Sequence, residues 1–93
     1  MTDNVTVHIP AALQRQADGH ESLSLSGDTV GEVLGVIRER YPALGGRLFK
    51  GEETLNRFIN VYVNDEDIRF LAKLDTPVSA GDEVSIVPAI AGG

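Results

Sequence analysis

The chain has 93 residues, of which 42% are hydrophobic and 24% charged, with a formal net charge of −6 and no cysteine. These values predict one small globular domain and exclude a disordered chain. The missing cysteines exclude disulfides, thiolate catalysis and cysteine-bound zinc. The negative charge argues against nucleic acid and anionic membranes as partners, and it suits a protein partner with a basic groove.

The sequence shows no targeting or membrane signal. No apolar run reaches the roughly 20 residues that a membrane-spanning helix needs. The first residues, MTDNVTVHIP, lack the basic start and the long apolar stretch of a signal peptide. We therefore expect the protein in the cytoplasm.

The first half of the chain predicts two strands and a helix. Residues 5–9 alternate apolar and polar side chains, which predicts a half-buried strand ending at Pro10. Residues 11–20 predict an irregular polar loop with a turn at Asp18-Gly19. Leu23 and Leu25 alternate with serines, which predicts a second strand, antiparallel to the first.

The helix is predicted by its start signal and its spacing. Thr29 and Glu32 match a capping box, in which a hydroxyl and a carboxylate bind free amides at a helix start. Pro42 ends the predicted helix near Tyr41, because the residue before a proline avoids helical geometry. Apolar residues recur on one face at Val30, Val33, Leu34, Ile37 and Tyr41.

The second half predicts mostly strands. Residues 43–57 read as a loop whose Leu48 and Phe49 reach the edge of the core. Residues 58–63, FINVYV, form an aromatic and β-branched run typical of a strand. Residues 64–67 predict a polar turn, 68–70 a short edge strand, and 84–87 a last strand closed by Pro88.

This order predicts a two-layer α+β domain, because one main helix can cover only one face of a sheet. With the first and last strands side by side in the middle, the arrangement resembles the β-grasp fold of ubiquitin. We expect a mixed sheet of four to five strands with the helix packed on one face. Residues 1–87 would form this domain, and residues 88–93 a flexible C-terminal Gly-Gly tail.

Alternation also predicts which sheet face is free. Ile59, Val61 and Val63 should face the helix, and Val84 and Ile86 should join them in the core. The opposite face would carry an apolar patch suited to a protein partner, unless the 43–57 loop covers it. The predicted partner-binding residues are Phe58, Tyr62, Val87, Pro88 and Ile90.

The side chains predict no catalytic, cofactor or metal site. His8 and His20 lie on different predicted elements without ligand partners, so they read as surface histidines. The acidic residues 65–67 lack the glycine and the distal glutamate of a calcium loop. Residues 46–51 have the glycine spacing of a phosphate loop without its lysine and hydroxyl residue.

What remains is the C-terminal carboxylate on Gly92-Gly93. Without Cβ atoms, such a tail can enter a narrow channel and lie close to a partner's backbone. A carboxylate becomes an acyl donor only after activation, for example by ATP as an acyl-adenylate. Nothing in the sequence predicts an ATP site, so another protein must supply it. The alternative is a frayed end without function.

The strand order, the stretches 61–64 and 81–84, and the terminal Gly-Gly make this chain similar to the ubiquitin-like sulfur carriers of the ThiS/MoaD type. The resemblance covers essentially the whole chain. It implies that a ubiquitin-activating-like adenylyltransferase adenylates the carboxylate of Gly93 and that a thiocarboxylate then forms. Gly92 would match the flexible neighbour of the activated residue. Val87 and Pro88 would match the docking region, whereas Tyr62 is an aromatic at a position that is aliphatic in ubiquitin.

The resemblance leaves the sulfur recipient open. The stretches 60–70 and 88–93 look nearest to carriers that feed a pyridoxal-phosphate-dependent cysteine synthase, with a metalloprotease releasing the product. The small subunit of molybdopterin synthase, which delivers sulfur in the large subunit, is a near neighbour. Other interpretations are a modifier conjugated to lysines and a β-grasp module with an inert tail. In each case the chain is expected to be a monomer alone and to bind no cofactor, with ATP on its partners.

Overall fold

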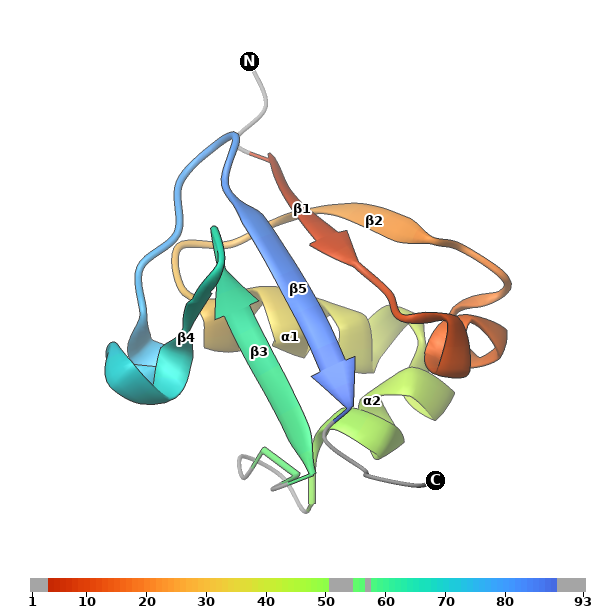
Figure 1. The fold of residues 1–93 in the computed structure, drawn as a ribbon. Helices are drawn as coiled ribbons and strands as arrows, with labels where there is room; N and C mark the ends of the chain where they lie inside the picture. The colour runs from red at the N-terminus through yellow and green to blue at the C-terminus, as the bar shows by residue number, and fades with distance from the viewer. Residues whose placement is uncertain (1–3, 51–54, 57, 89–93) are drawn as a thin grey trace.

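The computed structural model describes residues 4–50, 55–56 and 58–88, and it shows a five-stranded sheet with two α-helices on one face (Figure 1). Three short 3₁₀ helices join these elements. In chain order they are β1 (Asn4–His8), η1 (Ala11–Ala17), β2 (Ser22–Ser26), α1 (Val30–Arg40), α2 (Pro42–Leu48), β3 (Ile59–Val63), β4 (Glu66–Asp67), η2 (Ile68–Phe70), η3 (Lys73–Asp75) and β5 (Glu83–Pro88).

The strand order is β2-β1-β5-β3-β4. β1 and β5 pair in parallel, and the other neighbours pair antiparallel. The first and last strands therefore lie side by side in the middle of the sheet, as the sequence predicted. This confirms the α+β, β-grasp arrangement with a mixed sheet.

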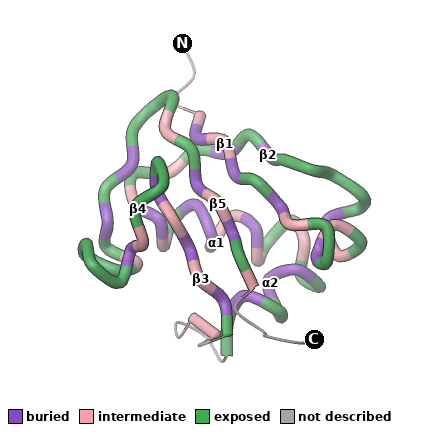
Figure 2. Tube along the Cα trace, viewed as in Figure 1, coloured by how far each residue is buried: buried purple, intermediate pink, exposed green. Residues whose placement is uncertain are grey.

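Side-chain alternation separates the two sheet faces, and the inner face forms the core with the helices (Figure 2). Ile59, Val61 and Val63 are buried, as are Val84 and Ile86, which confirms the predicted orientation of β3 and β5. Burying a side chain of this size contributes about 1.5–3 kcal/mol. The helices add Val30, Val33, Leu34, Ile37, Leu44 and Leu48 to the same core.

The capping box at the start of α1 is present in a shifted form. The Glu32 amide donates to Thr29 Oγ1 at 3.2 Å, as predicted. The Glu32 carboxylate accepts from the amide of Asp28 at 2.9 Å, one residue before the amide expected for this motif. Both bonds satisfy amides that have no partner within the helix.

The predicted loop at 43–57 is wrong for residues 42–48, which form α2. Pro42 does end α1, but it also occupies the first turn of α2, where its missing N–H is not needed. Two adjacent glycines, Gly45 and Gly46, hid the helical pattern. The pattern remains in Leu44 and Leu48, which are four residues apart and fully buried.

The predicted loop at 11–20 is likewise wrong for residues 11–17, which form η1 with Leu13 and Ala17 buried. The turn at Asp18-Gly19 is confirmed, because both residues have the positive φ of a left-handed turn. Polar residues between two buried positions made this short helix look like a loop.

The edge of the sheet differs from the prediction by one element. Asn64 and Asp65, with φ values of 49° and 74°, form the whole turn, and residues 66–67 pair with β3 as β4. Residues 68–70, predicted as the edge strand, form η2 instead, because the Asp67 carboxylate caps them by accepting from the Arg69 amide. Three residues are too few for alternation to distinguish a strand from a helix.

No helix in the described part of the chain is long and apolar enough to cross a membrane. The cytoplasmic location expected from the sequence stays a prediction.

The close approach of α1 and α2 gives a test of the packing. A Cβ on Gly45 would lie 2.7 Å from Arg38 Cγ and 2.8 Å from Arg38 Cα, whereas one on Gly46 would meet nothing within 4 Å. We expect Gly45→Ala to lower the free energy of unfolding by about 1–3 kcal/mol, because the helices must move apart. Gly46→Ala should raise it by up to about 1 kcal/mol through helix propensity. Urea denaturation measures both, and equal effects would contradict the close approach.

Candidate functional site

The C-terminal tail follows directly from the central strand of the sheet. β5 is hydrogen-bonded to β1 on one side and to β3 on the other, and its last residue, Pro88, lies opposite Ile59 (Figure 1). The pairing with β1 ends at Ser85, and the pairing with β3 continues to Pro88 and fixes the end of the strand. Ile90, Gly92 and Gly93 lie outside the described residues, so their predicted roles stay predictions.

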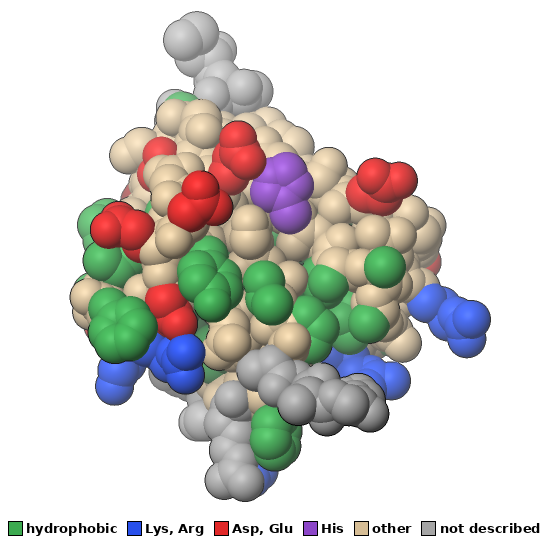
Figure 3. Space-filling model, viewed as in Figure 1, with side chains coloured by type: hydrophobic (Ala, Val, Ile, Leu, Met, Phe, Trp, Pro, Cys, Tyr) green, Lys and Arg blue, Asp and Glu red, His purple; other side chains and the backbone are tan. Residues whose placement is uncertain are grey.

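The sheet face opposite the helices carries an apolar strip formed by Tyr62 and Val87, which we call the Tyr62–Val87 strip. Tyr62 pairs with Ser85 and Asn60 pairs with Val87, so Tyr62 and Val87 are diagonal neighbours on one face. Tyr62 is half-buried and Val87 is 41% exposed. Hydrophobic side chains cross the middle of this face in Figure 3. α2 covers the opposite face, so residues 42–48 do not cover the strip.

Phe58 belongs to a different part of the surface than predicted. It lies in the turn before β3, 48% exposed, with its amide donating to Asn56 Oδ1 at 2.9 Å. Phe58 and Pro88 share a hollow of about 280 Å³ at the end of β5. The structure thus divides the predicted patch into the Tyr62–Val87 strip and this hollow.

Sequence reasoning missed the other walls of the hollow. Ala12 and Leu13 come from η1, and Arg47 comes from α2, both segments that the sequence predicted as loops. Arg47 is the one cation among the described residues that line the hollow. It lies near Pro88, where a C-terminal segment without charged side chains begins. The helical spacing of Leu44 and Leu48 was the signal that could have placed it.

Acidic side chains border the strip near the start of β5 (Figure 3). His8, predicted as a surface histidine, is exposed, and its Nε2 lies 2.8 Å from Glu83 Oε1. Asp82 accepts from Asn64 Nδ2 at 3.1 Å and from the Ser79 amide at 2.8 Å. These bonds hold the two carboxylates in place. The carboxylates of Asp82 and Glu83 give this end of the face a negative charge.

The described residues form no metal-binding cluster. Among them, no three His, Asp or Glu side chains are placed to hold a metal ion. Residues 65–67 fall on the turn and β4, where Asp67 pairs with Arg69.

Comparison with protein families shows that the model of the ThiS family matches residues 7–93, which include Gly92 and Gly93. The chain belongs to the ThiS family. It is 46% identical to the sulfur carrier protein CysO of Mycobacterium tuberculosis over 92 residues, covering 97% of this chain and 99% of that one. It is also 34% identical over 82 residues to small archaeal modifier protein 3 of Haloferax volcanii, covering 85% and 88%.

Solved structures agree with the sequence comparison. A crystal structure of the Amycolatopsis orientalis BexX/CysO complex contains a chain that is 47% identical, with a TM-score of 0.87 and coverage of 96% of this chain and 99% of that chain. The crystal structure of M. tuberculosis CysO gives 44% identity and a TM-score of 0.85, with coverage of 94% and 100%. The ThiS-family sulfur carrier fold is thus shared along nearly the whole chain.

The Arg69–Asp67 pair beside the site has a testable titration. Arg69 donates from its side chain and its amide to the Asp67 carboxylate, and these bonds hold the pKa of Asp67 below its ordinary value. A lowered folded-state pKa adds stability above the ordinary pKa, and this stability is lost as the pH falls through the folded-state value. Arg69→Met should raise the pKa of Asp67 in a carboxyl NMR titration. Lys73→Met should leave it unchanged, and an unchanged value in Arg69→Met would contradict the pairing.

Proposed function

We propose that this protein is a sulfur carrier whose Gly93 carboxylate is converted to a thiocarboxylate and consumed by a partner enzyme. The observation that carries the proposal is the 46% identity to a protein named as a sulfur carrier, over 97% of this chain. The family match runs to Gly93 and supports the same function. The relatives named as sulfur carriers support a carrier rather than an enzyme.

The proposed chemistry has two steps. The Gly93 carboxylate oxygen attacks the α-phosphate of ATP on an adenylyltransferase, which releases pyrophosphate and leaves an acyl-adenylate. A sulfur nucleophile then attacks the acyl carbon and displaces AMP, so that sulfur replaces one oxygen. Adenylation is needed because a free carboxylate has no good leaving group. ATP stays with the partner.

The fold supports this chemistry by giving the tail a fixed base. β3 holds β5 in register up to Pro88, which lies opposite Ile59, and β1 pairs with its first half, residues 83–85. A partner that docks on the sheet therefore meets the start of the tail at a defined place. We assign Gly92 and Gly93 to the part that enters the partner's active site, because residues without Cβ atoms fit a narrow channel.

We assign docking to the Tyr62–Val87 strip and to the hollow that Phe58 and Pro88 share, with Ile90 beyond them. Both surfaces adjoin β5, so one partner can contact the sheet and the tail together. Exposed aromatic and aliphatic groups of this kind become binding hot spots when a partner excludes water from them. The BexX/CysO complex supports a protein partner, since its CysO is similar to this chain.

Cysteine synthesis is the recipient pathway that we propose, because the sulfur carrier CysO is similar to this chain over 97% of its length. The recipient would then be a cysteine synthase that carries pyridoxal phosphate, and a metalloprotease would release the amino acid. The molybdopterin branch is supported less, since the Pyrococcus furiosus putative molybdopterin converting factor subunit is only 20% identical and shows the fold alone.

The first test weighs the intact protein. Incubation with a cognate adenylyltransferase, ATP and sulfide should raise its mass by the difference between sulfur and oxygen. A chain lacking Gly93 should fold as before, by circular dichroism, and gain no such mass. An unchanged mass of the full-length chain, with an adenylyltransferase shown to be active on another carrier, would refute the proposal.

The second test addresses docking. Val87→Asp places a charge in the Tyr62–Val87 strip and should slow activation at least about tenfold, as expected for the loss of a contact worth about 1.4 kcal/mol. Ser24→Asp is the matched control, because it adds the same charge to an exposed position on β2. Equal rates for both variants, measured by formation of the acyl-adenylate, would show that the strip does not dock.

A protein modifier is the second candidate function, and the small archaeal modifier relative favours it. It would use the same activated Gly93 but transfer it to lysine side chains. Digestion of cell protein and mass spectrometry would reveal Gly-Gly remnants on lysines if this occurs. Their absence under several growth conditions, together with thiocarboxylate formation, would leave the carrier function alone.

A further inference from the structure

β2 is the end strand of the sheet, and one of its edges has no partner strand in the described part of the chain (Figure 1). β1 pairs with the other edge in an unbroken antiparallel register that runs from Asn4 opposite Ser26 to His8 opposite Ser22. An end strand presents a row of backbone N–H and C=O groups that can pair with another chain. The proposed carrier function uses β5 and the tail, so it leaves this edge unexplained.

The register shows which backbone groups of β2 point outward. The Ile9 amide donates to the Glu21 carbonyl at 2.8 Å, so these two residues form a hydrogen-bonded pair. Such pairs alternate along antiparallel strands, so Leu23 and Leu25 bond to β1 and the serines of β2 turn their amides and carbonyls outward. No described residue forms a hydrogen bond with these outward backbone groups. The edge therefore offers donors and acceptors at the spacing of a strand.

β2 lacks the features that commonly protect an end strand. Such strands are often very short, or they carry lysine, proline or a bulge. β2 has five residues, SLSLS, without a charge, a proline or a break in its register. Its leucines are buried and its exposed side chains are serines, so none of its own side chains is long enough to cover the edge.

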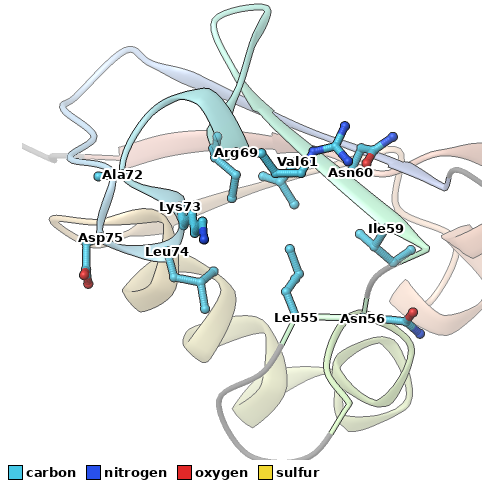
Figure 4. Close-up of a pocket in the computed structure, with 11 residues that line it drawn as sticks. Leu55, Asn56, Ile59, Asn60, Val61, Arg69, Ala72, Lys73, Leu74 and Asp75 are labelled. Carbon is cyan, nitrogen blue, oxygen red and sulfur yellow. The ribbon is translucent and has the colours of Figure 1, made fainter.

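The opposite end of the sheet is closed. β4 has two residues and pairs only with Tyr62 and Val63 of β3. Beyond β4, the segment from η2 to η3 and β3 line a hollow of about 520 Å³ (Figure 4). Leu55, Val61 and Leu74 point into this hollow, so a partner would meet side chains there and not a row of backbone groups. Among the described strands, β2 thus has the edge that is open to strand pairing.

Acidic side chains lie at both ends of this open edge. Glu21 precedes β2 and Asp28 follows it, and both are exposed and form no ion pair with another described residue. The whole chain has a formal net charge of −6. These charges repel a second copy of the chain. They favour a partner segment that carries lysine or arginine on either side of its pairing residues.

We propose that the β2 edge binds an extended segment of another protein, whose backbone pairs with the outward amides and carbonyls of Ser22, Ser24 and Ser26. Cationic side chains that flank this segment face Glu21 and Asp28. The backbone bonds supply the affinity, and the charges supply the preference for a basic segment. β1 separates β2 from β5, so this partner leaves the Tyr62–Val87 strip uncovered. The binding does not depend on the sulfur-carrier function.

Hydrogen exchange of the full chain, followed by NMR, tests the open edge with a defined probe. The probe is a peptide of alternating valine and threonine, which favour an extended strand, with lysines at each end. Without the probe, the amides of Ser22, Ser24 and Ser26 should exchange fast and those of Leu23 and Leu25 slowly. The probe should slow the exchange of the three serine amides. No slowing at these amides would overturn the proposal.

A proline at the centre of β2 tests the backbone pairing. Ser24→Pro removes one outward amide and should raise the dissociation constant of the probe at least about tenfold, because the facing carbonyl loses its donor. β1 does not use this amide, and end strands tolerate proline on their solvent side, so circular dichroism should show an intact fold. Ser24→Ala is the matched control, because it changes the same side chain and keeps the amide. Equal constants for the two variants would show that no strand pairs at this edge.

Two altered probes test the chemistry of the partner without a change to the protein. Methylation of the probe's pairing amides should abolish binding, because the serine carbonyls then have no donor. Glutamates in place of the terminal lysines should weaken binding several-fold, and this difference should shrink as salt is added, since Glu21 and Asp28 are exposed. Equal binding of the lysine and glutamate probes would overturn the charge preference. Concentration-dependent protection of the serine amides without any probe would assign the edge to a second copy instead.

Discussion

The pairing of β5 on both of its edges is the constraint on which the rest of the structure depends. β1 pairs with residues 83–85 of the last strand, and β3 holds the strand in register as far as Pro88, so the described chain ends on a strand in the middle of the sheet. An edge strand would fray and would leave its unpaired amides open to other strands. Here the tail has a fixed base, and every surface that a partner could use beside the tail is defined relative to that base.

The sheet can support function because only one of its faces is needed for stability. α1 and α2 cover the inner face, and the buried residues of all the longer strands point toward them. The outer face keeps small and polar side chains with the Tyr62–Val87 strip at its centre and carboxylates at one end. Substitution on this face can therefore change partner choice without removing core contacts.

The proposed reaction needs groups from this chain and groups from its partner enzymes. No metal-binding cluster is present among the described residues, and the family to which the chain belongs includes proteins named as sulfur carriers. On the proposed function, the chain supplies one reactive group and a docking surface, and the partner enzymes supply the nucleotide and the active site.

The sequence by itself determined the four longer strands, the main helix and the Gly-Gly end, because alternation, a capping box and a proline are local signals that tertiary contacts did not override. It also predicted which side of β3 and β5 is buried, since a period of two leaves only two choices. Only the tertiary structure decided that residues 11–17 and 42–48 are helical, because their burial comes from contacts between distant segments. For the same reason, only the structure separated Phe58 from Tyr62 and placed Phe58 in a hollow whose walls come from residues far apart in the chain.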